Sequence, residues 1–313
     1  MTSYHTSIGV VGNGFVGNAI AKAFQNPNWH QRALETPHTA SVRIYDTNAD
    51  KCTHSLKDTV RSDFVFVCLP TPMTSAEGGD CDTSILENFF DNLSVKGDSP
   101  TRSSGMAYGK ESQAYLEDDI TIFVIKSTVP VGTTQRLCEK YPHLHIVHSP
   151  EFLTAANAET DFMYADRHVV GGNKHLAHAV ADLYEMYFPN TPVVSMSSNE
   201  SEAVKYFANT FLIMKVAFFN QMKELCDSVG ANWENVHEGV ITDTRIGESH
   251  TQVPGPDGQC GFGGTCFPKD LNALIRTFEK NGVDASLLRG IWEYNKAVRE
   301  EWDWSDNESA VVQ

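Results

Sequence analysis

Residues 8–17 read Ile-Gly-Val-Val-Gly-Asn-Gly-Phe-Val-Gly, a short apolar run that leads directly into a glycine-rich turn. Gly12, Gly14 and Gly17 have GxGxxG spacing, and the helix-like sequence Ala-Ile-Ala-Lys-Ala-Phe follows them. In a dinucleotide-binding fold these glycines allow the tight turn, the approach of a pyrophosphate and the packing of the helix on the strand. The motif alone is a weak signal, but here a strand precedes it and a helix follows. It predicts an α/β fold that begins with a Rossmann-like, doubly wound parallel sheet.

The next expected strand, at residues 42–45, ends in Asp46. A carboxylate at this place accepts hydrogen bonds from the ribose hydroxyls of NAD and repels the 2′-phosphate of NADP. The spacing from Gly17 is longer than the ~20 residues usual for such an acid. The sequence therefore predicts NAD as the cofactor.

Two continuous apolar runs, at residues 64–69 and 120–125, are typical of strands buried on both faces. The second run is followed by Ser127 and Thr128. Ligands bind at the carboxyl ends of such strands, so both hydroxyls are candidates for a binding site. Capping of the next helix explains either hydroxyl equally well.

A further strand is expected at residues 145–148, where it leads into Ser-Pro-Glu and makes Glu151 a candidate for the same edge. The histidines have no metal-ligand spacing, and His148 is expected at the strand surface. Residues 94–119, rich in Ser, Gly and charge, are expected to form an exposed insertion.

From residue 199 a single helical segment continues without Gly or Pro until Gly230. Apolar residues occur on almost every side of this helix. We therefore expect it to be buried by several other elements, with a second subunit among them. Lys205 and Asn209 are four residues apart and share one face. Burying a lysine without a partner is costly, so a buried Lys205 would indicate a function. The alternative is that the amine of Lys205 extends to solvent and Asn209 is an ordinary surface amide.

Residues 261–270 read Gly-Phe-Gly-Gly-Thr-Cys-Phe-Pro-Lys-Asp. With Thr265 as the expected N-cap, Cys266 lies at a helix N-terminus, where the helix dipole and Lys269 favour the thiolate. Asp270 lies one helical turn further on, so a nucleophile and a base share one site. A tight buried turn is the other explanation for this stretch.

The composition narrows the class of protein. The 313 residues suffice for two domains, which we expect at 1–196 (the sheet) and 197–313 (all-helical). The net charge of -16 without a basic cluster argues against nucleic acid. Seven cysteines without a CxxC pair, no apolar run of ~18 residues and no signal peptide predict a cytoplasmic protein with no structural metal and no membrane contact. The acidic tail after Glu301 is expected to fray.

Six motifs together resemble the UDP-glucose/GDP-mannose dehydrogenase family, in the family's order and over nearly the whole chain. They are GNGFVG (12–17), CLPTP (68–72), STVPVGTT (127–134), SPEFL (149–153), EAVKYFANTFLIMKVAFFN (202–220) and GFGGTCFPKD (261–270). The Phe-Leu at the end of SPEFL resembles the form of this motif in the branches of the family that act on glucose and mannose.

The resemblance implies an NAD-dependent, four-electron oxidation of the C6 alcohol of a nucleotide sugar, UDP-glucose to UDP-glucuronate, through a cysteine thiohemiacetal and thioester. By matching motif, the catalytic residues are Cys266, Lys205, Asn209, Asp270, Glu151 and Thr128. The cofactor positions are Gly12, Gly14, Phe15, Val16, Gly17, Asp46, Lys51, Thr71, Thr128 and Lys269. The substrate positions are Phe152, Leu153, Lys205, Asn209, Arg245 and Gly263. A homodimer through the helix at 199–229 is implied as well, with Arg245 reaching across it.

The sequence also departs from the family. Thr154, Ala155 and Ala156 stand where the family usually has Arg-Glu-Gly, so a second glutamate is absent. The family's C-terminal nucleotide-binding domain has no counterpart in these residues, so we expect base recognition to come from long loops, another subunit or a separate chain. A GDP-mannose 6-dehydrogenase and a non-catalytic NAD-binding remnant that needs a partner chain stay open as alternatives.

Overall fold

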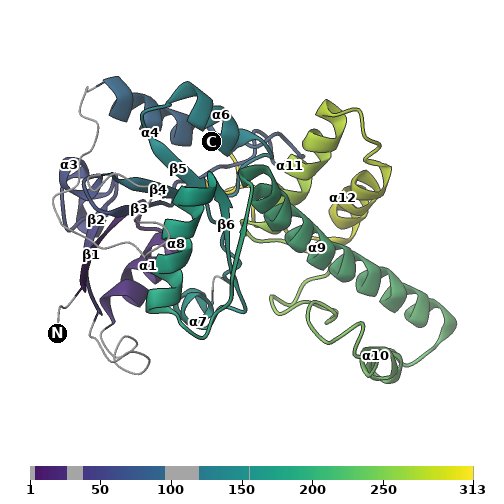
Figure 1. The fold of residues 1–313 in the computed structure, drawn as a ribbon. Coiled ribbons are helices and arrows are strands. Elements are labelled where there is room, and N and C mark those ends of the chain that lie inside the picture. Colours follow the sequence, from purple (N-terminus) through teal and green to yellow (C-terminus); the bar gives the residue numbers. More distant parts are fainter. Residues whose placement is uncertain (1–3, 27–37, 96–119, 155, 313) are drawn as a thin grey trace. The chain divides into compact units, whose positions relative to one another are not determined.

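The structure is a computed structural model that describes residues 4–26, 38–95, 120–154 and 156–312. The chain forms two compact units, each with its own core. The first comprises residues 1–70 and 83–205, and the second comprises residues 71–82 and 206–313. Figure 1 shows the ribbon coloured along the sequence. The expected domain boundary at 196–197 stays a prediction.

The first unit is built on a seven-stranded sheet with the order β2-β1-β3-β4-β5-β6-β7. The strands are β1 (Tyr4–Val11), β2 (His38–Tyr45), β3 (Phe64–Val67), β4 (Ile122–Ile125), β5 (His145–His148), β6 (His168–Gly172) and β7 (Val193–Met196). Strands β2 to β5 are parallel along this order, as predicted. The sheet is mostly parallel, with one exception: β6 pairs antiparallel with β5, and β7 pairs parallel with β6.

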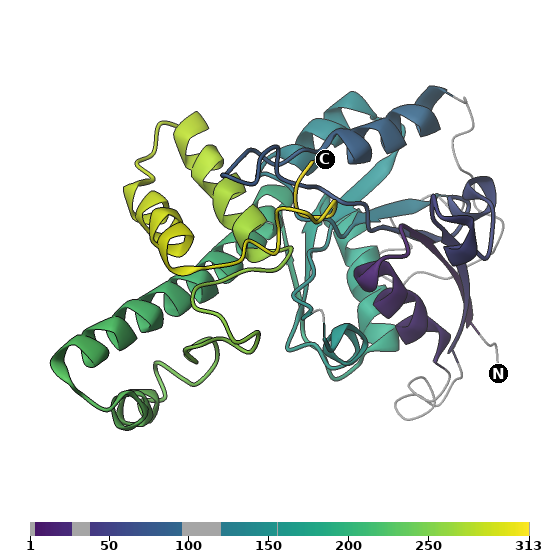
Figure 2. The ribbon, with the colours of Figure 1, turned by 180° about the vertical axis from the view of Figure 1, so that it is seen from behind.

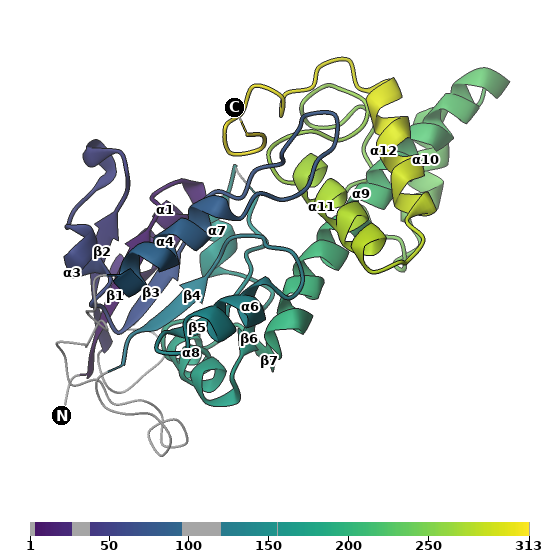
Figure 3. The ribbon, with the colours of Figure 1, turned by 90° about the horizontal axis from the view of Figure 1, so that it is seen from above.

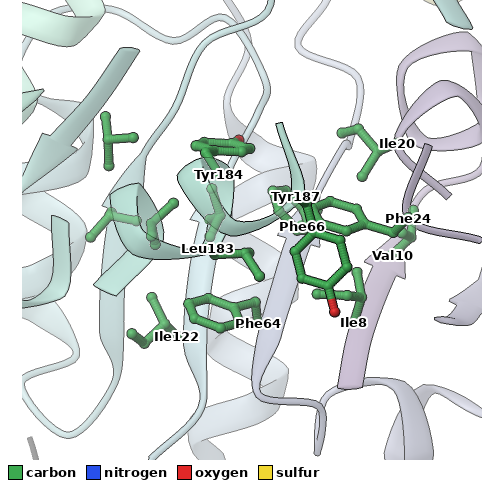
Figure 4. Close-up of a cluster of buried hydrophobic side chains, with 14 of the residues drawn as sticks. Ile8, Val10, Ile20, Phe24, Phe64, Phe66, Ile122, Leu183, Tyr184 and Tyr187 are labelled. Atoms are coloured by element: carbon green, nitrogen blue, oxygen red, sulfur yellow. The ribbon is translucent and has the colours of Figure 1, made fainter. Parts of the chain in front are cut away.

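Helices cover both faces of this sheet. They are α1 (Phe15–Gln25), α3 (Leu56–Thr59), α4 (Ser84–Val95), α6 (Thr133–Lys140), α7 (Ala158–Met163) and α8 (Lys174–Tyr187), with a short 3-10 helix η1 (Ala49–Lys51). On one face, α1, α7 and α8 pack over Ile8, Val10 and Phe66 (Figure 4). On the other face lie α4 and α6 (Figure 3). Their side chains Phe90 and Leu137 belong to the same buried cluster as Val65 and Val67. Successive strand residues point to opposite faces, so apolar runs here fill two layers.

Strand β1 lies between β2 and β3. The chain therefore forms β2 on one side of β1 and then crosses to the other side of β1 to form β3. Open α/β sheets bind ligands at the carboxyl ends of strands at such a switch point. The glycine turn that follows Val11 is located there. The topology therefore puts the predicted dinucleotide motif at the position where this fold uses it.

The second unit is mainly helical, as predicted for the C-terminal region. Helix α9 (Ser198–Val229) starts in the first unit and continues into the second, where α10 (Trp233–Ile241), α11 (Phe267–Lys280) and α12 (Ser286–Val298) follow. The core gathers side chains of α9, α11 and α12, with Tyr206, Leu271 and Trp292 among them.

The C-terminal tail does not fray, so that expectation is wrong. Trp304 is fully buried, and its indole Nε1 donates to the carbonyl oxygen of Ala76 at 3.1 Å. The backbone N–H of Val312 donates to the carbonyl oxygen of Met73 at 2.8 Å, so the tail pairs with the segment 71–82 (Figure 2). The net negative charge of the tail suggested exposure, but the burial of Trp304, Ala310 and Val311 outweighs it.

In the part of the chain that the structure describes, no helix is long and apolar enough to cross a membrane. The same residues contain no group of three or more His, Cys, Asp or Glu side chains that could hold a metal ion. Of the expected insertion at 94–119, the first two residues belong to α4, and the rest lies outside the described residues.

Candidate active site

The glycine turn has the geometry that a dinucleotide needs. Gly12 has a φ of +89°, and a Cβ there would lie 2.5 Å from the carbonyl oxygen of Cys68. A Cβ on Gly17 would lie 1.9 Å from the carbonyl oxygen of Gly12, so helix and turn pack without room for a side chain. At Gly14, the N-cap of α1, a Cβ would meet nothing within 4 Å. Two glycines thus serve close packing, and the third leaves open space at a helix N-terminus, next to Phe15 and Val16.

Asp46 ends β2 beside this turn. Its Oδ2 accepts a hydrogen bond from the backbone N–H of Asn13 at 2.6 Å, and its Oδ1 accepts one from Asn48 at 2.8 Å. Burial would raise the pKa of Asp46, but these N–H groups and the charge of Lys51 outweigh burial and lower it. The carboxylate is therefore ionised at neutral pH, in the place predicted for recognition of a ribose. The side chain of Asn13 also donates to the carbonyl oxygen of Lys51 at 2.9 Å.

Glu151 and Lys205 form a buried ion pair in the first unit. The Nζ of Lys205 lies 2.9 Å from Oε1 of Glu151 and also donates to the carbonyl oxygen of Glu151 at 2.6 Å. The two side chains are 6% and 3% exposed, so Lys205 does not extend to solvent. The backbone N–H of Leu153 donates to the other carboxylate oxygen at 2.7 Å. The ring of Phe152 lies 5.5 Å from the ammonium, within cation–π range.

Lys126 is a residue that the sequence reasoning missed. It follows β4 directly, is 2% exposed, and its Nζ donates to the carbonyl oxygen of Pro150 at 3.0 Å and to Oγ of Ser149 at 3.3 Å. Burial lowers the pKa of Lys126 to about 8, against the opposing effects of Cys68 and Glu151. A signal was available, because a lysine at the end of an apolar run needs a partner. Thr128, two residues on, is 7% exposed at the same strand end.

The expectation of a surface His148 is wrong. The side chain is fully buried, and its Nδ1 lies 2.8 Å from Oγ of Ser201. Burial and the nearby charge of Lys126 lower the pKa of His148 to about 3, so the ring is neutral. Strand β5 is only four residues long, with a histidine at each end, so its sequence did not reveal that helices cover both of its faces.

In the second unit, Asp270 is the centre of a buried polar group. Its Oδ1 lies 2.6 Å from Nζ of Lys269, and its Oδ2 accepts a hydrogen bond from Nδ2 of Asn209 at 2.6 Å. Burial would lower the pKa of Lys269, but the adjacent carboxylate of Asp270 outweighs burial and raises it. The ammonium of Lys269 thus keeps its charge inside the unit, and the amide of Asn209 is oriented by the carboxylate of Asp270.

Cys266 is the N-cap of α11, one residue later than the expected cap Thr265, and its side chain is partly buried. Its carbonyl oxygen accepts the first helical hydrogen bond from the backbone N–H of Asp270, at 2.8 Å. Pro268 falls in the first turn, where its missing N–H does no harm. The thiol therefore sits at the positive end of a helix, as predicted.

Three other predicted positions are also found in the second unit. Thr71 is 4% exposed. Gly263 belongs to the loop before Cys266. The side chain of Arg245 is 88% exposed and makes an ion pair with Asp243 at 2.5 Å. Ala155, the site of the absent glutamate, lies outside the described residues.

The structure therefore brings the predicted residues together in groups within each unit. The first unit joins the glycine turn to Asp46, and Glu151 to Lys205 and Phe152. The second joins Asn209 and Lys269 to Asp270, at the start of the helix that Cys266 caps. Helix α9 carries Lys205 and Asn209 one turn apart. Within the second unit, a buried ammonium, an amide, a carboxylate and a thiol at a helix N-terminus form a chemical set suited to covalent catalysis at a carbonyl carbon.

Comparisons with known proteins agree with this picture. The UDP-glucose/GDP-mannose dehydrogenase family matches in its NAD binding domain at residues 107–188 and in its central domain at residues 199–297. UDP-glucose 6-dehydrogenase of Pseudomonas aeruginosa is 31% identical, over 93% of this chain and 65% of that protein. The enzyme of the same name from Rickettsia bellii is 31% identical, over 93% of this chain and 67% of that protein.

Among solved structures, a UDP-glucose dehydrogenase from Pyrobaculum islandicum superposes with a TM-score of 0.71 at 25% identity, over 94% of this chain and 69% of that chain. The chain thus spans about two thirds of the length of the curated relatives that it matches.

Proposed function

The chain belongs to the UDP-glucose/GDP-mannose dehydrogenase family, and from this premise we propose that it oxidises the C6 alcohol of a nucleotide sugar to the carboxylate. One observation carries the proposal: Cys266 is the N-cap residue of α11, and a buried carboxylate, Asp270, lies one turn further along. A module that only binds NAD has no chemical need for this arrangement.

NAD is the cofactor, and the residues of the first unit fit it. Gly14 leaves the space at the N-terminus of α1 that a pyrophosphate fills, and Asp46 offers an ionised carboxylate to the ribose hydroxyls. When bound, NAD+ takes up a hydride, and the oxidation of an alcohol to an acid requires this twice. No other step depends on the cofactor.

The residues of the chain carry the remaining chemistry. Lys205 and Asn209 hold the C6 oxygen and stabilise negative charge on it. Cys266 attacks the aldehyde carbon, forming a C–S bond in a thiohemiacetal, and loss of a hydride and a proton from this intermediate leaves a thioester. Water then attacks the thioester carbon, the thiolate leaves and the acid forms.

Protons and water in these steps are handled by carboxylates. Asp270 orients Asn209 and assists proton transfer, and Thr128 in the first unit offers a hydroxyl that can hold water. Glu151 acts as the base for hydrolysis of the thioester, and the ion pair with Lys205 holds its carboxylate in place. The absence of the family's second glutamate at Ala155 leaves Glu151 to do this alone.

UDP-glucose is the substrate we propose, because the curated relatives that match over most of the chain carry that substrate in their names. The Phe152-Leu153 pair after Glu151 resembles the glucose and mannose branches alike, so it argues against UDP-N-acetylmannosamine only. GDP-mannose is the second candidate, since the reacting groups would be identical.

The test counts NADH formed per sugar consumed by the purified chain, with UDP-glucose, GDP-mannose and UDP-N-acetylmannosamine in turn. We expect two NADH per UDP-glucose and UDP-glucuronate as the product. One NADH per sugar with aldehyde as the product would refute the thioester. Binding of NAD without turnover of any sugar would instead favour the non-catalytic remnant.

We also propose that the chain forms a homodimer through α9. Phe207, Phe211, Phe218, Leu225 and Val229 are between 54% and 69% exposed, and they recur at heptad-like spacing along one face of this helix. A second copy of the same helix would cover this row. Arg245, which is exposed in the same unit, would then be available to the partner's substrate.

Sedimentation equilibrium of Phe218→Lys tests this interface, because a charge in the middle of the row should give a monomer. Asp227→Lys, on the opposite face of the same helix, is the matched control and should leave the dimer intact. A monomeric wild type, or a Phe218→Lys variant that dimerises as well as the control, would contradict the proposal.

A further inference from the structure

The loop at residues 261–264, immediately before Cys266, is fixed by side chains from three distant parts of the second unit. The backbone N–H of Gly261 donates to Oδ1 of Asn220 on α9 at 3.0 Å. The N–H of Phe262 donates to Oδ1 of Asn295 on α12 at 2.7 Å. The N–H of Gly264 donates to Oδ2 of Asp303, in the tail, at 2.9 Å.

Asp303 is itself held by Arg299. The guanidinium Nη2 lies 3.0 Å from Oδ1 of Asp303 and 2.7 Å from Oδ2 of Asp257, and Nε donates to the carbonyl oxygen of Glu301 at 3.0 Å. The side chain of Arg299 is 1% exposed. A planar guanidinium with several fixed acceptors has little freedom, so the carboxylate of Asp303 is held with one oxygen on Arg299 and the other on the loop.

The loop packs directly against this pair. A Cβ on Gly263 would lie 2.2 Å from Nη2 of Arg299 and 2.3 Å from Oδ1 of Asp303, so backbone and ion pair are in contact with no side chain between them. Asp303 is also anchored through the next residue, because Trp304 is fully buried and hydrogen-bonded to Ala76. The part of the tail expected to fray thus reaches the loop that presents the thiol.

We propose that Arg299 and Asp303 are positioning residues, which hold the loop at 261–264 in the conformation that places Cys266 at the N-terminus of α11. The inference rests on the proposed role of Cys266 as the nucleophile. The pair touches neither the thiol nor the sugar. It acts through the backbone of Gly263 and Gly264, and it keeps the loop formed before any substrate binds.

The first measurement is hydrogen–deuterium exchange of the full chain, followed in peptides that cover residues 261–266. In Asp303→Ala, which removes the acceptor and the charge, these amides should exchange about tenfold faster than in wild type. Asp303→Asn keeps an acceptor for Gly264 and should fall between the two. The control is Asp284→Ala. It removes the carboxylate that accepts a hydrogen bond from the backbone N–H of Ser286, at the start of α12. Exchange of the amides at residues 261–266 should stay as in the wild type.

The second measurement is turnover of UDP-glucose. In Asp303→Ala, kcat should fall about tenfold or more while the KM for NAD stays within about twofold, because a misplaced nucleophile affects the chemical step and not cofactor binding. Asp284→Ala should retain the kcat of the wild type. A loss of stability alone would lower the active fraction of both variants, so the control separates the two effects.

Unchanged exchange at 261–266 in Asp303→Ala would overturn the proposal, and so would faster exchange with an unchanged kcat. The exchange measurement needs no substrate. If the wild type turned over no nucleotide sugar, the proposed function would fail while exchange still decided whether the pair holds the loop.

Discussion

Replacement of Asp270 by Asn tests the polar group at the start of α11. Asp270 is fully buried, and its carboxylate is the counter-charge of Lys269, whose side chain is 9% exposed, at 2.6 Å. Asn is nearly the same size and can still accept a hydrogen bond, so the change removes charge without opening a cavity. It leaves an ammonium group inside the unit with no carboxylate beside it.

Removal of one member of a buried ion pair typically destabilises a protein by about 3–5 kcal/mol, and we expect a loss in that range. The control is Asp80→Asn, which removes the same charge from the ion pair with Lys280 in the same unit. Those side chains are 36% and 63% exposed, so the expected loss is at most about 1 kcal/mol. The double variant Lys269→Met, Asp270→Leu should recover part of the loss, since no charge stays buried.

Urea unfolding followed by tryptophan fluorescence is a suitable assay, because Trp233, Trp292 and Trp304 all belong to the second unit. In the wild type the pKa of Lys269 is raised in the folded state, so the pair stabilises the protein below the unfolded pKa of Lys, about 10.4.

In Asp270→Asn, burial without a counter-charge lowers that pKa instead, and the penalty is relieved as the pH rises. The difference between wild type and variant should therefore shrink from pH 7 to pH 10. A loss no greater than that of Asp80→Asn at pH 7 would refute the reasoning.

Three further predictions concern other parts of the proposed site. In Lys126→Met, the free energy of unfolding of the wild type relative to the variant should increase from pH 8 to pH 10. The reason is that Lys126 has a pKa of about 8 in the folded protein and about 10.4 in the unfolded chain. Urea unfolding at both pH values would measure this difference. Cys266→Ser should lower acid formation by about 10³-fold or more, with a slow first oxidation retained, and product analysis by mass spectrometry would detect any acid. Asp46→Ala should weaken NAD binding by about tenfold and reduce the preference over NADP, as titration calorimetry with both cofactors would reveal.

Much of the fold could be predicted from the sequence because the decisive signals are local. The glycine spacing and Asp46 identify the first βαβ unit, and the structure places the acid against the backbone of the turn, at Asn13. The apolar runs at 64–69 and 120–125 became β3 and β4, since strands covered on both faces need no alternation. The long helix at 199–229 lacked any breaker and became α9.

What the sequence did not predict depends on contacts between distant residues. The reversal at β6 has no local signature, because a strand has the same periodicity in either direction. The order of the tail comes from Trp304 and Ala310, which pack against residues 71–82 of the chain. Lys126 is explained by its acceptors Ser149 and Pro150, and no periodicity links these to it.

The two buried lysine–carboxylate pairs are hard to explain by stability alone. Lys205 with Glu151, and Lys269 with Asp270, each take two charges out of water, and well-packed apolar side chains often do as well or better in such places. Each pair also orients a further group, the backbone at Leu153 in one case and the amide of Asn209 in the other. Desolvated charges that are already oriented need little rearrangement when an oxyanion develops, and stabilisation of that kind is often the largest contribution to catalysis. Each unit of this chain therefore carries a buried pair that is more readily explained by chemistry than by folding.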